Sequence, residues 1–348
     1  MIHQISVAEF TGLPDVPLAD VRTPAEFAHG HVPAAFNLPL FDNEERVKVG
    51  TAYKQQSREE AILLGFDLTG NKWSGFIKDA LKVCPQKKVA VHCWRGGMRS
   101  GAMAWALNLY GFEVYVIKGG YKNFRRWVLQ QFENQYQLCV LGGMTGSGKT
   151  KILHQLKTMG GQVIDLEDLA QHQGSSYGTL GKLIQPTQEQ FENNLAMQLS
   201  ALNKSRPIWV EDESLTIGQR VIPNPFWQQM RNAVLINLKI VTEKRIANLV
   251  EEYGNLEPGF LIECTERIRK RLGPLQTQQA VAAILENRMA DFIRLVLVYY
   301  DKTYRNGLGK RLAENVFPFE TSTENAADNA QQLMNFMPVK EASAKTVS

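Results

Sequence analysis

The chain has 348 residues, of which 44% are hydrophobic and 21% are charged, and its formal net charge is +4 at pH 7. At roughly 100–200 residues per domain, this length predicts about two domains, and the apolar fraction is sufficient to fill more than one core. No uncharged apolar run reaches the ~18 residues of a membrane span, and the N-terminus lacks the basic-then-apolar order of a secretory signal. A soluble cytoplasmic protein with no membrane partner is therefore expected.

Residues 1–130 alternate short apolar stretches with stretches of helical spacing. Thr23 is predicted to cap a helix in which Pro24 takes the first position and Glu26 completes a capping box. Strands are predicted at residues 88–92 and 114–117, with a glycine-bearing loop and a helix over residues 100–110 between them. Strands that alternate with helices predict a parallel sheet with helices on both faces.

The loop after the strand at residues 88–92 carries the first chemical signal. The strand delivers Cys93 into a loop with two glycines, and the next helix begins near Ser100. Loop N–H groups and a helix N-terminus favour an anion, and together with nearby arginines they lower a thiol pKa, which makes Cys93 the predicted catalytic nucleophile. The predicted anion-binding residues are Arg95, Gly96, Gly97 and Arg99.

Two chemistries fit this loop. One is transfer of a sulfur or selenium atom, and the other is phosphate-ester cleavage, because His-Cys-x5-Arg-Ser is also a phosphatase loop pattern. The other three cysteines, Cys84, Cys139 and Cys264, are predicted to be buried small hydrophobes. The absence of any CxxC pair argues against a zinc knuckle or a disulfide framework and fits a reducing compartment.

A polar stretch over residues 130–137 is the predicted domain junction, and a second α/β unit follows it. Its strands are predicted at residues 138–141, 162–164, 207–210 and 235–241, and residues 247–312 are predicted to be mostly helical. The predicted domains are residues 1–130 and 137–338. Residues 339–348 are small and polar and are predicted to form a disordered tail.

Residues 143–150 match the GxxxxGK[ST] pattern in full, between an apolar strand and a helical stretch, which is the context of a P-loop. The glycines let backbone N–H groups surround a phosphate, Lys149 supplies charge to the outer phosphates, and the Thr150 hydroxyl suits Mg²⁺. Asp165 and Asp212, near the ends of two neighbouring strands, join Thr150 as candidate metal ligands. The predicted phosphate-binding residues are Gly143, Gly146, Ser147, Gly148, Lys149 and Thr150.

Positive charge is concentrated between residues 267 and 311, which hold ten Lys or Arg and three Asp or Glu. Phosphate contacts from such a surface would give salt-sensitive binding of a nucleic acid. A solvated helix face is the alternative interpretation. The candidate nucleic-acid-binding residues are Arg267, Arg269, Lys270 and Arg271, with a second basic patch at Arg125 and Arg126.

The N-terminal part resembles a rhodanese domain. The resemblance rests on DVRTPAEF at residues 20–27, on GHVPAAFNLP at residues 30–39 and on the position of the Cys93 loop, which has one more residue between cysteine and arginine than the usual pattern. A rhodanese domain followed by a P-loop domain, with CWRGGMRS, GGMTGSGKT and VEDES at residues 210–214, resembles the bacterial tRNA 2-selenouridine synthase family. The implied fold class is α/β: a rhodanese-like parallel-sheet domain, then a P-loop NTPase-like α/β domain with a helical C-terminal part.

This resemblance implies that the substrate is 2-thiouridine at the wobble position of tRNA and that selenium from selenophosphate replaces its sulfur. It also implies transfer of a geranyl group from geranyl diphosphate to the sulfur, so the P-loop is expected to hold a prenyl diphosphate with Mg²⁺ rather than ATP. One alternative is a phosphatase or sulfurtransferase fused to an ATP-dependent, kinase-like P-loop domain. Another is a non-catalytic regulatory module with a nucleotide switch.

Overall fold

The structure is a computed structural model. It describes residues 1–172, 177, 184–321 and 325–336. The chain forms two compact units. The first comprises Met1–Gln131 together with Thr187–Met197, and the second comprises Phe132–Pro186 and Gln198–Ser348. The tail predicted at residues 339–348 lies outside the described residues.

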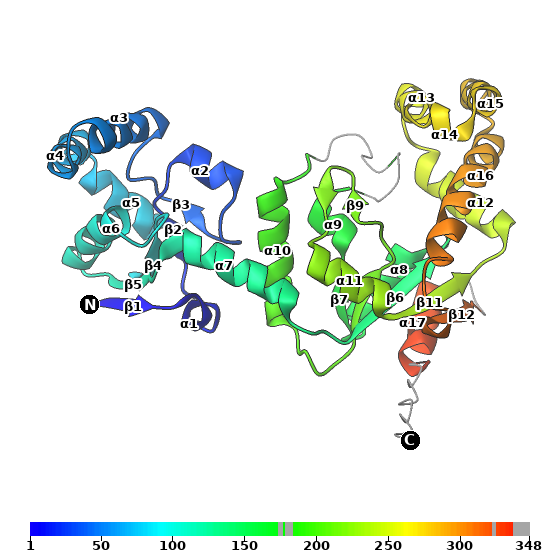
Figure 1. Ribbon diagram of the computed structural model, residues 1–348, viewed down its shortest axis with the longest axis horizontal. Coiled ribbons are helices and arrows are strands. Elements are labelled where there is room, and N and C mark those ends of the chain that lie inside the picture. The colour runs from blue at the N-terminus through cyan, green and yellow to red at the C-terminus, as the bar shows by residue number, and fades with distance from the viewer. Residues whose placement is uncertain (173–176, 178–183, 322–324, 337–348) are drawn as a thin grey trace, which may run out of the picture. The chain divides into compact units, whose positions relative to one another are not determined.

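The sheet of the first unit has five strands in the order β1-β5-β4-β2-β3, and every neighbouring pair is parallel (Figure 1). The predicted parallel sheet is therefore confirmed. The strands are β1 (Ile2–Ile5), β2 (Leu18–Asp20), β3 (Phe36–Asn37), β4 (Lys88–His92) and β5 (Glu113–Ile117). The helices that begin in this unit are α1 (Val7–Thr11), α2 (Pro24–His29), α3 (Asn43–Gln55), α4 (Arg58–Thr69), α5 (Trp73–Val83), α6 (Met98–Leu109), α7 (Gly120–Glu133) and α10 (Gln188–Ala201).

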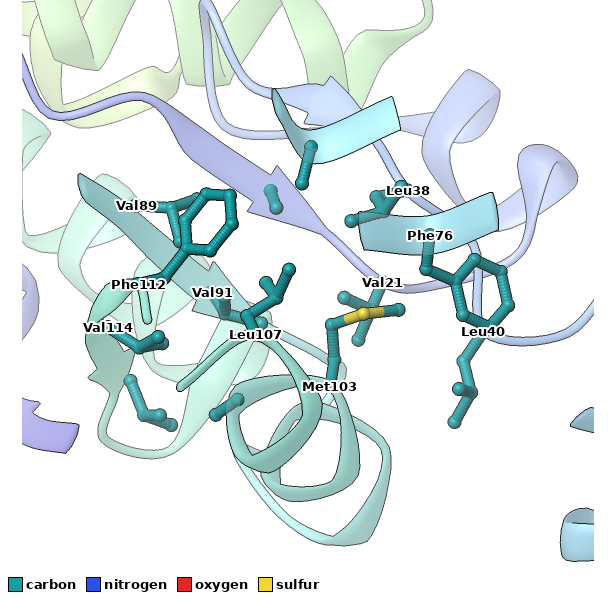
Figure 2. Close-up of a cluster of buried hydrophobic side chains, with 14 of the residues drawn as sticks. Val21, Leu38, Leu40, Phe76, Val89, Val91, Met103, Leu107, Phe112 and Val114 are labelled. Carbon is teal, nitrogen blue, oxygen red and sulfur yellow. The ribbon is translucent and has the colours of Figure 1, made fainter. Parts of the chain in front are cut away.

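The core of this unit lies against one face of the sheet. Every second strand residue points to that face, including Val89 and Val91 of β4 and Val114 of β5. Figure 2 shows Met103 and Leu107 of α6 in the same cluster as these valines. This packing fixes α6 against the sheet, and the loop between β4 and α6 is therefore held at both ends.

Helix α2 begins as the sequence predicts. The Thr23 hydroxyl accepts a hydrogen bond from the Glu26 backbone N–H at 3.2 Å, the Glu26 carboxylate accepts one from the Thr23 backbone N–H at 3.0 Å, and Pro24 takes the first helical position. The capping box places the Glu26 side chain at the start of α2, where it also meets Arg99.

The segment Thr187–Met197 packs with the first unit, although the sequence places it within the P-loop domain. Its polar side chains account for this. The Tyr121 hydroxyl donates to Glu189 at 2.8 Å and accepts from the amide of Asn193 at 2.8 Å. The Gln190 side chain accepts from the backbone N–H of His31 at 2.8 Å.

The sheet of the second unit has the order β12-β11-β6-β8-β7, again with every neighbouring pair parallel. Its strands are β6 (Leu138–Gly143), β7 (Gln162–Ile164), β8 (Ile208–Glu211), β11 (Val234–Lys239) and β12 (Val316–Glu320), and β9 (Thr216–Ile217) and β10 (Arg220–Val221) form a small antiparallel pair. The four predicted strands are present within two residues at each end. The sequence does not predict β12, an edge strand that contains Pro318.

Helices α8 and α17 pack against the sheet of the second unit, with Leu153 of α8 and Leu333 of α17 in one buried cluster with the strands. Helices α12 to α16 form a separate cluster around Phe292, which confirms the predicted helical C-terminal part. The helices are α8 (Lys149–Thr158), α9 (Leu166–Ala170), α11 (Asn224–Asn232), α12 (Thr242–Tyr253), α13 (Pro258–Arg267), α14 (Arg269–Leu272), α15 (Pro274–Leu285), α16 (Met289–Leu308), the 3-10 turn η1 (Ala313–Asn315) and α17 (Ala326–Asn335). Within the described ranges, no helix has the length and apolar character to cross a membrane.

Candidate active site

Cys93 lies directly after β4, and its side chain is only 3% exposed. Its Sγ is 3.3 Å from the Ser100 hydroxyl and accepts a hydrogen bond from the Gly97 backbone N–H at 3.3 Å. Gly97 is the N-cap residue of α6 and Ser100 lies in that helix's first turn. The sulfur is therefore held at a helix N-terminus, where the helix dipole favours negative charge.

These contacts change the acidity of the thiol. Burial acts to raise the pKa of Cys93, but the hydroxyl and backbone of Ser100, the backbone of Arg95 and the charge of Arg99 outweigh it, so the pKa lies below its ordinary value. Burial alone raises the pKa of Cys84 to about 11 and that of Cys139 to about 12. All four cysteines are free and buried. Among them, Cys93 has a lowered thiol pKa, and the pKa values of the other three are raised.

The Cys93 loop is held in place from the start of α7. The Cys93 carbonyl accepts a hydrogen bond from the Tyr121 backbone N–H at 2.9 Å. A Cβ on Gly120 would lie 2.2 Å from that carbonyl, and the φ of Gly120 is +58°. Only glycine fits this close approach of two backbone segments. The predicted loop residue Gly96 has a φ of +64°, and a Cβ on it would lie 2.7 Å from the Ile117 carbonyl.

A buried charged cluster lies beneath the loop. Arg22 makes hydrogen bonds to both carboxylate oxygens of Asp20, with the shortest contact at 2.6 Å, and its guanidinium stacks on the Tyr121 ring at 3.7 Å from the centroid. His92 is buried beside Asp20, and its pKa is lowered by burial and by the charges of Arg22 and Arg99, so its ring is neutral. Because this cluster is internally paired, it supports the loop and offers no free charge to a ligand.

The two loop arginines have different surroundings. Arg99 pairs with Glu26 at 2.7 Å and is half-buried. Arg95 is exposed. Of the predicted anion-binding residues, Gly97 therefore contacts the sulfur directly, Arg99 acts on it through its charge, and Arg95 acts through its backbone.

In the second unit, β6 leads into the P-loop and then into α8, as the motif predicts (Figure 1). Lys149 folds back over the loop, and its ammonium donates to the Gly143 carbonyl at 2.9 Å. The Ser147 hydroxyl is buried and has no hydrogen-bond partner within the described part of the chain. Thr150 is half-buried in the first turn of α8, next to Lys149. Gly148 precedes the helix with a φ of +75°.

Helix α12 holds the P-loop from one side. Arg245, 2% exposed, donates to the Thr145 carbonyl at 2.8 Å and pairs with Asp301 at 2.5 Å. The Asn248 amide donates to the Gly146 carbonyl at 2.8 Å. A Cβ on Gly146 would lie 2.7 Å from the Arg245 carbonyl, so this position too requires glycine.

Three carboxylates at the end of β8 and the start of α9 interact with one another, and two of them also interact with Lys149. Glu211 ends β8, Glu213 follows it, and Glu167 lies in the first turn of α9. Burial, together with mutual repulsion, raises the pKa of Glu167 to about 7 and that of Glu213 to about 8, and it raises that of Glu211 well above its ordinary range. Lys149 opposes the first two shifts, which places its ammonium near these groups.

Of the three predicted metal ligands, the two carboxylates have other partners. Asp212, the residue after β8, makes an ion pair with Arg311 at 2.6 Å. Asp165 caps α9 by accepting from the Asp168 backbone N–H at 2.8 Å, and it pairs with His154 at 3.0 Å. The carboxylate that ends the strand beside β6 is Glu211.

One buried carboxylate oxygen near the P-loop strand is available to a cation such as Mg²⁺. Glu211 is 1% exposed, and its Oε1 has no hydrogen-bond partner among the described residues. No group of three or more His, Cys, Asp or Glu in those residues is arranged to hold a metal ion. Mg²⁺ at phosphate sites takes one or two protein ligands together with phosphate oxygens and water. The carboxylate of Glu211 and the hydroxyl of Thr150 are oxygen ligands of the type that such a site needs.

A cavity of about 720 Å³ adjoins the P-loop and includes Met144 and Ser147 in its wall. Much of the remaining wall is apolar, from the end of β11 and from α16, with Leu238, Ile240 and Leu308. Lys239, Lys244 and Arg305 add positive charge to the same wall. The cavity is thus a place next to a phosphate-binding loop that accepts an apolar group.

The predicted tRNA-binding residues divide into two groups. Arg267, Arg269, Lys270 and Arg271 are exposed on α13 and α14; Arg267 pairs with Glu263 and Arg269 with Glu266, and Arg271 donates to the Tyr299 hydroxyl. In the first unit, Arg126 is exposed, whereas Arg125 is held by Glu189, Glu192 and Asn193. Arg125 therefore fixes the segment Thr187–Met197 to α7.

The sequence did not identify Ser100 and Arg245 as site residues, and from the acidic run at residues 211–213 the prediction chose Asp212 rather than Glu211. The serine stands next to Arg99 in the phosphatase-like pattern, so the pattern contained a signal for it. Glu211 belongs to the acidic run after β8, and the side on which each member of that run lies depends on where the strand ends. Nothing in the sequence around Arg245 connects it with the P-loop 100 residues earlier.

The described geometry agrees with two family models. One, described as the tRNA 2-selenouridine synthase AAA domain, matches residues 136–335, and a rhodanese-like domain model matches residues 6–126. The chain belongs to the tRNA 2-selenouridine synthase family. The match of both models within one chain confirms the resemblance on which the expected fold rests.

Relatives named tRNA 2-selenouridine synthase are similar over most of the chain. The relative from Nitrosomonas europaea is 36% identical over 82% of this chain and 75% of its own length. The relative from Shewanella oneidensis is 35% identical over 86% of this chain and 88% of its own length. A crystal structure of an N-terminal domain from Clostridium difficile 630 is 39% identical, covers 36% of this chain and 98% of that one, and has a TM-score of 0.35.

Proposed function

We propose that this enzyme converts wobble 2-thiouridine in tRNA to 2-selenouridine through an S-geranyl intermediate. The observation that carries the proposal is the presence, in a member of this family, of two different anion-binding loops. One holds a thiol of lowered pKa, and the other is a P-loop beside a largely apolar cavity. Each loop suits one of two successive steps.

The first step is assigned to the P-loop unit. The sulfur of 2-thiouridine bonds to C1 of geranyl diphosphate, the C1–O bond breaks, diphosphate leaves and the N3 proton of the base is lost. Lys149 and the loop N–H groups stabilise the charge of the departing diphosphate. Glu211 and Thr150 are the residues that would hold Mg²⁺, which neutralises phosphate charge when bound. The cavity beside Met144 accepts the prenyl chain.

The second step is assigned to the Cys93 loop. A thiocarbonyl sulfur leaves poorly, but after geranylation it leaves as geranylthiol. The selenium of selenophosphate bonds to C2 as the C2–S bond breaks, and water then cleaves the P–Se bond to give phosphate, so no atom is oxidised or reduced. The loop N–H groups, together with the charge of Arg99, favour the selenophosphate anion. We assign Cys93 to this step because its sulfur accepts a hydrogen bond from one of the same loop N–H groups.

The tRNA is proposed to contact the exposed basic residues of α13 and α14, through phosphates. A reducing cytoplasm is the compartment that keeps Cys93 as a thiol.

The test is mass spectrometry of nucleosides from 2-thiouridine tRNA incubated with the enzyme, geranyl diphosphate and selenophosphate. Wild-type protein is expected to form S-geranyl-2-thiouridine and then 2-selenouridine. Cys93→Ser is expected to stop at the S-geranyl nucleoside, and Lys149→Ala is expected to form neither product from 2-thiouridine. Lys151→Ala is the matched control, since Lys151 is exposed on the same helix and pairs only with Glu251 in the described residues.

Two results would contradict the proposal. Loss of geranylation in a folded Cys93→Ser protein would show that the two steps do not divide between the loops. Tight ATP binding, with no binding of geranyl diphosphate in competition, would assign the P-loop to nucleotide chemistry instead.

A further inference from the structure

The first unit carries an apolar groove of about 850 Å³ that the two-step scheme does not use. Its lining comes from α3, α4, the first turns of α6, Trp73 of α5 and the segment before α3. Helices α3 and α4 lie side by side (Figure 1). Val47, Tyr53, Phe66 and Met98 line it and are each more than half exposed. A contiguous apolar surface of this kind marks a binding site more often than an ordinary solvated face.

The groove lies next to the residues that contact the Cys93 sulfur. Met98 and Arg99, which line it, directly follow Gly97, and the Gly97 backbone N–H donates to the Cys93 sulfur. Ser100, the next residue, places its hydroxyl 3.3 Å from the same sulfur. A ligand that contacts Met98 in the groove therefore lies next to the helix turn whose residues contact the Cys93 sulfur.

The lining indicates the chemistry of the occupant. The Thr69 hydroxyl, a polar group in the wall, already donates to the Gly65 carbonyl at 2.8 Å. The remaining wall is mostly aliphatic and aromatic, which suits a hydrocarbon chain better than a peptide or a sugar. The charged groups that line the groove, Arg46, Lys54 and Arg99, are all basic. This charge complements a polyanion attached to the chain.

We infer that this groove binds the prenyl chain of the S-geranylated wobble nucleoside and so presents its C2 atom to the Cys93 loop. The inference rests on the proposed function, because that function supplies the S-geranyl intermediate. A nucleoside with a ten-carbon chain on an RNA backbone combines the apolar tail and the negative charge that the groove and its basic residues fit. Unmodified 2-thiouridine has no such chain, so the groove selects the intermediate for selenation.

Gly101 allows the groove to be filled without disturbing α6. It lines the groove, and a Cβ built on it meets no atom within 4 Å. Gly101→Phe puts a ring into the space for the chain, whereas Gly101→Ala adds only a methyl group at the same position. The alanine variant is thus the matched control for the loss of glycine from the helix.

The experiment compares anticodon stem-loop RNAs that carry S-geranyl-2-thiouridine or S-methyl-2-thiouridine. Wild-type protein and Gly101→Ala are expected to bind the S-geranyl RNA at least about tenfold more tightly than the S-methyl RNA, a difference that burial of about two methylene groups supplies. Gly101→Phe is expected to lose this preference and to bind the S-methyl RNA unchanged. Formation of S-geranyl RNA from geranyl diphosphate is expected to be the same in all three proteins.

The failures of the inference and of the proposed function are distinguishable. If wild-type protein forms no 2-selenouridine from S-geranyl RNA and selenophosphate, the proposed function fails. If it forms the product but shows no preference for the geranyl over the methyl group, or if Gly101→Phe keeps that preference, the groove inference alone fails. A change in sedimentation between wild type and Gly101→Phe without RNA would show that a second copy of the chain occupies the groove, and it would also overturn the inference.

Discussion

Replacing Ser100 with alanine removes the hydroxyl that lies 3.3 Å from the Cys93 sulfur. This hydroxyl is the largest of the contributions that lower the Cys93 pKa against the effect of burial. A hydrogen bond to a charged group contributes about 1.5–3 kcal/mol, and one pKa unit corresponds to about 1.4 kcal/mol. Because the Gly97 N–H remains, we expect the lower end of that range, a rise of about one pKa unit in Ser100→Ala.

The assay is the pH dependence of thiolate absorbance near 240 nm, checked by mass spectrometry of Cys93 after alkylation at several pH values. The other cysteines do not interfere near neutral pH, because burial raises the pKa of each of them. Ser74→Ala, at an exposed position in α5, is the control and is expected to leave the titration unchanged. Equal midpoints for wild type and Ser100→Ala would refute the assignment of the lowered pKa to this hydroxyl.

Three further predictions follow from the second unit. Burial raises the pKa of Glu213 to about 8 in the folded state, so the stability of the wild-type protein should fall as pH rises from about 4.5 through 8. In thermal unfolding, Glu213→Gln should weaken this pH dependence, and the control Glu251→Gln should leave it unchanged. Arg245→Leu leaves Asp301 without its ion-pair partner and should lower the free energy of urea unfolding by about 3 kcal/mol. The double variant with Asp301→Leu should recover part of this loss. Equal losses in the single and double variants would show that the unpaired Asp301 carboxylate does not contribute to the loss. Replacing Lys270 and Arg271 with alanine should weaken tRNA binding and reduce the slope of log K against log salt by up to about 2, whereas Lys78→Ala, on α5, should change neither.

Local chemistry explains which elements the sequence predicts well. The capping box at Thr23 and the strands β4 and β7 follow from side-chain types within a few residues, and the structure has them at the predicted positions. The edge strands β1 and β12 were not predicted; β1 has polar residues at the two central positions of its four, and β12 contains Pro318. Both gain their strand character by pairing with β5 and β11, which lie more than 75 residues away in the chain.

In the candidate sites too, the sequence predicts what depends on neighbouring residues and does not predict what depends on distant ones. The thiol loop and the P-loop are continuous segments, so the sequence identifies Cys93 and Lys149 together with their neighbours. The choice between the carboxylates at the end of β8 did not follow from the sequence. Asp212 and Glu211 are adjacent in sequence and alike in chemistry, but β8 turns Asp212 to Arg311 and leaves Glu211 buried without a partner for its Oε1.

The sequence by itself determined the two loops, their order in the chain and the resemblance to a family, because each depends on residue types at fixed short spacings. Tertiary structure alone decided which groups adjust the chemistry of these loops. Ser100 and the helix N-terminus act on Cys93, Arg245 holds the P-loop from 100 residues away, and several helices line the apolar groove beside Met98. Such effects depend on distance and burial in space, which no short pattern of residues records.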